Sequence, residues 1–190
     1  MRQGRQRLAA AVLCSALAGS ALAGEPRPAP GVSPQAARDA FARIKALAGR
    51  WRGSSTRGWT DEVRIRTIAG GSAVVQDGAG SPEGTAGAHP GQEMMTVFYL
   101  DGDRLMLTHY CAARNHPRLV AREIADGGRT LVFRFLDGAN LASRDHGHMD
   151  AVVLRILGAD RFATRWTWYD HGSEKWMEDI ERTRIADVAR

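Results

Sequence analysis

From Arg50 to the C-terminus, apolar and polar residues alternate with a period of two, which is the pattern of half-buried β-strands. Val63, Ile65 and Thr67, for example, alternate with charged residues. Short glycine- and aspartate-rich turn signals separate the apolar stretches, as at Gly70-Gly71. The pattern predicts about ten strands, over residues 51–54, 63–67, 72–76, 94–100, 104–111, 119–125, 130–136, 148–157, 161–169 and 174–185.

A long antiparallel series of this kind is expected to close on itself, because closure removes the exposed strand edges. One helix precedes it. Ser33 and Pro34 form an N-cap and first helical residue, and apolar residues follow at helical spacing as far as Gly49. The predicted fold class is therefore all-β, an antiparallel barrel of about ten strands with a short N-terminal helix.

The first 23 residues have the features of an export signal. Three arginines precede a short apolar stretch, and Ala21-Leu22-Ala23 offers small residues before a cleavage point at Gly24. Lipid attachment at Cys14 is the alternative, although Leu13 is a poor residue to precede it. We therefore predict a signal peptide over 1–23, a disordered proline-rich tether over 24–33 and a single barrel domain over 34–190.

Removal of the signal changes the charge and the cysteine content. Three arginines leave with it and no acid does, so the formal net charge falls from +5 to about +2. This weak charge removes the main support for a nucleic-acid partner. Only Cys111 remains, so no internal disulfide is expected and stability must come from a core. No later segment resembles a membrane span.

Several residue types typical of small-molecule sites fall on strand faces predicted to point inward. His109 and Cys111 share one face of their strand, as do Trp166 and Trp168, and His148 shares a face with Asp150. An apolar cavity with a few polar groups is the usual form of a ligand site, and a filled core is the alternative. The candidate ligand-binding residues are His109, Cys111, Asn140, His148, Trp166 and Trp168, with Asn140 coming from the polar loop over 138–147.

Three other chemistries are alternatives to simple binding. His146 and His148, joined by His109 or Asp150, have spacing that a metal could use, and haem could bind through a single histidine. Cys111 could act as a nucleophile with a histidine as its base. Neither a metal-binding motif nor a nucleophile elbow accompanies these residues, so no metal or cofactor is expected. Residues 115–117 are expected to form the turn after the His109 strand, and the glycine-rich segment 78–91 a long loop.

The segment Gly49-Arg50-Trp51 resembles the start of the first strand in calycin barrels, the lipocalin and fatty-acid-binding proteins. In those families the tryptophan plugs the closed end, and an arginine from the last strand lies across its ring. The resemblance implies that Trp51 has this role here, with Arg182 or Arg184 above it; Arg184 suits the position best. A guanidinium over an indole face gains cation–π energy.

A narrower resemblance covers most of residues 41–185. The stretches LDGDRLMLTHYCAARNHPRL, FRFLDGANLASRDHGHMDAVVLRIL and FATRWTWYDHG are similar to an exported bacterial lipocalin-like family of unknown function. This chain departs from that pattern at Asp150, where a histidine is expected, and in the length of the 78–91 loop. The resemblance implies the barrel fold and carries no established activity. From the inward-facing histidines and tryptophans we predict an exported barrel that binds a small, largely hydrophobic ligand; a hydrolase using histidine with aspartate or cysteine in the same cavity is the alternative.

Overall fold

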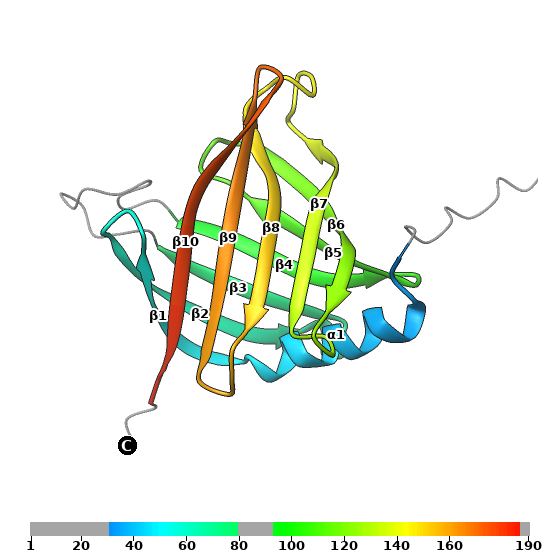
Figure 1. The fold of residues 1–190 in the computed structure, drawn as a ribbon, viewed down its shortest axis with the longest axis vertical. Coiled ribbons are helices and arrows are strands. Elements are labelled where there is room, and N and C mark those ends of the chain that lie inside the picture. The colour runs from blue at the N-terminus through cyan, green and yellow to red at the C-terminus, as the bar shows by residue number, and fades with distance from the viewer. Residues whose placement is uncertain (1–30, 80–92, 187–190) are drawn as a thin grey trace, which may run out of the picture.

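Among residues 31–79 and 93–186, which the computed structural model describes, ten antiparallel strands form one closed barrel (Figure 1). Each strand pairs with its neighbours in the chain, and β10 pairs with β1 to complete the circle. The predicted fold class is confirmed. The strands are β1 Gly49–Ser55, β2 Thr60–Ile68, β3 Ala73–Ala79, β4 Glu93–Asp101, β5 Arg104–Tyr110, β6 His116–Ala125, β7 Thr130–Ala139, β8 His148–Ile156, β9 Arg161–Asp170 and β10 Ser173–Ile185.

Helix α1 (Pro34–Ala46) covers one end of the barrel and begins at the predicted residue (Figure 1). The Ser33 hydroxyl accepts a hydrogen bond from the Ala36 amide at 3.1 Å, which satisfies one of the free amides of the first turn. The apolar face of the helix packs against β4, β5 and β6. Its buried residues are Ala37, Ala40, Phe41 and Ile44.

The same end of the barrel is closed by Trp51, which is wholly buried. The Arg184 guanidinium lies 4.2 Å from the centre of its ring and donates a hydrogen bond to the Ala48 carbonyl at 2.7 Å. The Trp51 indole N–H donates to the Leu47 carbonyl at 2.8 Å, and Phe162 packs against the ring edge to face at 4.8 Å. Of the two arginines considered from the sequence, Arg184 is therefore the one above Trp51.

The interior is filled unevenly around the barrel. On the β5–β7 side, Leu107, Leu119, Leu131 and Phe133 are completely buried and pack as an apolar core. The strands on the other side, β1–β4 and β8–β10, direct several polar side chains inward. The cavity described below lies on the side with the polar side chains.

A bulge in β8 changes which of its residues face inward. Val152 lies opposite Trp166 and Met149 opposite Trp168, with Asp150 as the extra residue between them. Because one inserted residue reverses the alternation, Met149 shares the inward face of Trp166 and Trp168. His148 lies opposite Tyr169 and therefore faces the other way.

Some predicted segments differ in extent or lie outside the described residues. β6 begins at His116, so His116 and Pro117 belong to a strand and the turn after β5 ends at Asn115. The signal peptide over 1–23, most of the tether over 24–33 and most of the 78–91 loop lie outside the described residues. None of the helices within 31–79 and 93–186 has the length and hydropathy needed to cross a bilayer.

Candidate functional site

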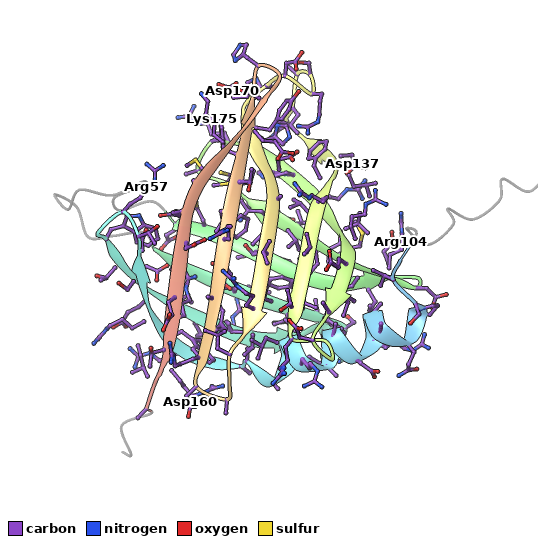
Figure 2. The ribbon with its side chains drawn as sticks, in the orientation of Figure 1. Arg57, Arg104, Asp137, Asp160, Asp170 and Lys175 are labelled. Atoms are coloured by element: carbon purple, nitrogen blue, oxygen red, sulfur yellow. The ribbon has the colours of Figure 1, made fainter. Side chains whose placement is uncertain are left out.

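A cavity of about 70 Å³ lies inside the barrel between β2–β5 and β8–β10. Charged groups elsewhere are mainly peripheral, as Figure 2 shows for Arg57, Asp160 and Asp170 near the turns between strands. The cavity wall combines large apolar side chains with a smaller set of polar ones, the usual composition of a small-molecule site. The apolar side chains are Trp59, Val63, Met94, Met149, Trp166 and Ile180. The polar ones are Asp61, Gln76, Asp77, Thr96, His109, Glu178 and Arg182.

A buried ion pair crosses β1 at one side of this cavity. Gly53 of β1 lies directly opposite Asp61 of β2 and Arg182 of β10. Arg182 Nη2 donates to Asp61 Oδ2 at 2.5 Å, and the two side chains are only 3% and 7% exposed. A Cβ atom at Gly53 would overlap Asp61 Oδ1, so glycine is required for the two side chains to meet above it.

Two further donors of the cavity wall are buried without an acceptor among the described residues. They are Trp59 Nε1 and Arg182 Nε, and Asp61 Oδ1 in the same wall is a buried acceptor without a hydrogen-bond donor among the described residues. Buried polar atoms are nearly always hydrogen-bonded, by protein, water or ligand, so such atoms call for an explanation. Glu178 differs, because its Oε2 accepts the Ser55 hydroxyl at 2.6 Å. The polar side of the cavity therefore offers two donors and one acceptor to a bound molecule.

His109 and Trp166 form another part of the cavity wall. His109 Nδ1 lies 3.0 Å from the Thr96 hydroxyl, its partner across the β4–β5 ladder. The imidazole packs 4.9 Å from the Trp166 ring, tilted by 44°. Both side chains are buried. Of the six ligand-binding candidates from the sequence, these two line the cavity.

Cys111 does not line the cavity. It follows the end of β5, where its amide donates to the Asn115 carbonyl and its own carbonyl accepts from the Arg114 amide. The side chain is 7% exposed, and this burial raises the pKa of the thiol above its ordinary value. A raised pKa keeps the sulfur protonated at neutral pH, which is unfavourable for a nucleophile.

Trp168 and Asn140 also lie outside the cavity wall. Trp168 is half-buried and packs so closely on Gly147 that a Cβ there would overlap its ring. Asn140 is exposed and adopts a left-handed conformation with φ of 55° just after β7. Asparagine tolerates this backbone conformation better than most residues, which accounts for its presence at the turn.

His148 belongs to a second buried cluster on the other face of β8. His148 Nδ1 lies 2.6 Å from the His146 carbonyl, so that nitrogen carries the proton, and Nε2 accepts from Arg144 Nη1 at 2.5 Å. Arg144 also donates to Asp150 Oδ1 at 2.5 Å and stacks 3.7 Å above the Tyr169 ring. These contacts hold the segment before β8 against the barrel, and none of them faces the cavity.

Asn115 strengthens this attachment. It is completely buried, and its amide donates to the Gly147 carbonyl at 2.8 Å, which links the β5–β6 turn to the segment before β8. The sequence indicated only a turn here. Among residues 31–79 and 93–186, no group of three or more histidine, cysteine or acidic side chains is arranged to hold a metal ion.

Trp59, Asp61 and Glu178 were not predicted from the sequence as cavity residues, and Arg182 was considered only as a partner of Trp51. A signal for three of them was present, because Glu178 and Arg182 share the alternation phase of the apolar Ile180, and Asp61 shares that of Val63 and Ile65. A charged residue in the inward phase of a strand indicates a buried polar group. Trp59 lies in the β1–β2 turn, where no periodicity gives its direction.

Comparisons with known proteins place the fold. No protein-family model matches the chain, and no curated protein does. The crystal structure of Rv2717c from M. tuberculosis is similar, with a TM-score of 0.50 and 14% sequence identity, over 77% of this chain and 98% of that one. The S-type phycobiliprotein lyase CPES from Guillardia theta has a TM-score of 0.40 and 12% identity, over 84% of this chain and 100% of that one. The closed ten-stranded antiparallel barrel is an all-β, calycin-like fold. The similarity to Rv2717c is a similarity of fold.

Proposed function

We propose that this protein is an exported barrel that binds a small, largely apolar ligand in the cavity between Trp59 and Trp166. The observation that carries the proposal is the presence of buried hydrogen-bond donors, Trp59 Nε1 and Arg182 Nε, in the wall of an otherwise mainly apolar cavity. Leaving such groups unpaired is unfavourable, and a ligand that pairs with them recovers that free energy.

The size of the cavity limits the ligand. About 70 Å³ is well below the roughly 300–1,000 Å³ of pockets that enclose drug-sized molecules. The cavity therefore suits a molecule of a few heavy atoms, or one end of a longer molecule. The hydrocarbon part of the ligand would contact apolar side chains of the wall, including Trp59, Trp166, Met149 and Ile180.

Binding is favoured over hydrolysis by the position of Cys111. A cysteine nucleophile must reach the substrate as a thiolate, whereas Cys111 lies outside the cavity wall and burial raises its pKa. His109 Nδ1 is bonded to the Thr96 hydroxyl. The alternative of a Cys–His hydrolase in this cavity thus lacks its nucleophile.

Filling the cavity tests the proposal. Met94 lies opposite Gly78 on the inward face of β4, and Met95 is its neighbour on the outward face. Met94→Trp is expected to occupy the cavity and to remove at least nine-tenths of the bound small molecule, while Met95→Trp retains it. The measurement is native mass spectrometry of each protein after isolation from its native host. Equal retention by both variants would place the ligand elsewhere.

Export is the second part of the proposal, and the N-terminal sequence supports it. Arg2, Arg5 and Arg7, the apolar stretch after them and Ala21-Leu22-Ala23 match the three regions of a cleavable signal. The protein isolated from its host is expected to begin at Gly24. A mature chain that retains Met1, or one that carries lipid on Cys14, would count against this prediction.

A further inference from the structure

We propose that the polar end of the ligand is uncharged and presents a carbonyl oxygen, and that the cavity discriminates against free carboxylates. The inference rests on the proposed function and specifies the class of ligand. Its basis is the combination of hydrogen-bond donors and ionised groups in the cavity wall.

The unpaired donors fix what the ligand must offer. The indole N–H of Trp59 is a donor only, and so is the Nε–H of Arg182, so each needs an acceptor. Neither has one among the described residues, although Trp59 is 7% and Arg182 3% exposed. Both side chains line the same cavity. An oxygen acceptor on the ligand would pair with such a donor.

The charges fix what the ligand must not carry. The positive charge of Arg182 is already balanced by Asp61 at 2.5 Å. Glu178, which is 5% exposed and accepts the Ser55 hydroxyl, adds a second carboxylate to the cavity wall. Asp77, the third acidic residue of the wall, pairs with Arg66 at 3.0 Å. Because the carboxylates of Asp61 and Glu178 already face one guanidinium, a carboxylate ligand would bring a further negative charge into a site of low dielectric constant. A carbonyl oxygen meets the donors without that repulsion.

A primary amide satisfies both requirements. Its carbonyl oxygen is an acceptor for Trp59 or Arg182, and its NH₂ group is a donor for the unpaired Asp61 Oδ1 or for Glu178. Hexanamide and hexanoate have nearly the same shape and differ in charge, so they separate the effect of charge from that of size. Hexylammonium carries the opposite charge on the same chain.

The experiment is calorimetric titration of the protein with these three probes at pH 8. At this pH hexanoate is ionised and hexylammonium is protonated, so the three probes differ in charge. Hexanamide is expected to bind about tenfold or more tightly than hexanoate, because of the repulsion from Glu178 and Asp61. Glu178→Gln should narrow this ratio by strengthening hexanoate binding. Trp59→Phe should weaken hexanamide binding about fivefold, the effect of one hydrogen bond.

Arg165→Lys is the matched control for Arg182→Lys. Arg165 forms an ion pair with Asp179 at 2.7 Å on the outer face, and its replacement should leave all three affinities unchanged. Arg182→Lys should weaken hexanamide binding, because lysine has no Nε donor in that position.

The outcomes separate the inference from the proposed function. Hexanoate binding as tight as hexanamide would overturn the inference and leave the proposed function standing, as would tighter binding of hexylammonium, which would indicate recognition by the carboxylates. Absence of binding by all three probes would count against both.

Discussion

Replacement of Trp51 by alanine is expected to lower the free energy of unfolding by roughly 3–5 kcal/mol, the usual cost of deleting a large buried aromatic side chain. Trp51 is wholly buried at the closed end of the barrel. It contacts Phe162 edge to face, lies under Arg184 and donates a hydrogen bond to Leu47. The substitution would remove these contacts together and leave a cavity where α1 joins β1.

Arg184→Ala should cost less, about 1–2 kcal/mol, because the side chain is partly exposed and contributes stacking and hydrogen bonds rather than volume. The two losses should not be additive, since the residues are in contact. Urea denaturation midpoints of the single and double variants measure this coupling, with the outer-face substitution Arg165→Ala as the control. Fully additive effects would show that Arg184 does not stabilise the barrel through Trp51.

Loss of the ion pair across Gly53 is expected to have a comparable effect. Asp61→Ala would leave the Arg182 guanidinium buried without a counter-ion, which typically costs about 3–5 kcal/mol. The two side chains are 2.5 Å apart and almost completely buried, so removal of one partner should be strongly destabilising. Urea denaturation of the variant should show the loss directly.

The double variant Asp61→Leu with Arg182→Met provides the control. Replacement of both partners by apolar side chains removes the buried charges together, so much of the lost stability should return. Glu62→Ala, on the exposed face of the same strand, should have little effect, because surface ion pairs contribute little. A double variant as unstable as Asp61→Ala alone would show that the charge of Arg182 is not the cause.

The fold could be predicted from local patterns because each strand pairs with its neighbour in sequence. Alternation identifies the strands, the glycine-rich turns separate them, and closure follows from the need to pair both edges. The start of the helix could also be predicted from a local signal, the N-cap Ser33 followed by Pro34. Predictions were wrong at some segment ends. His116 and Pro117 were expected in a turn, but they are the first two residues of β6.

The site was less predictable because it depends on long-range register. The Asp61–Arg182 pair requires three strands in one alignment, with a glycine at the middle position, and no local pattern contains that information. His148 shows the converse. Strict alternation from Val152 places His148 inside, but the extra residue Asp150 reverses its direction. The bulge has no clear signal in the sequence.

The mass of the folded protein, isolated from its native host and measured under non-denaturing conditions, tests the central claim most directly. A barrel that binds a small molecule between Trp59 and Trp166 should have a folded mass greater than that of its polypeptide by one small ligand. The excess should disappear on unfolding and should be absent from the Met94→Trp variant. A folded mass equal to that of the polypeptide in the wild-type protein and in Met94→Trp alike would contradict the claim.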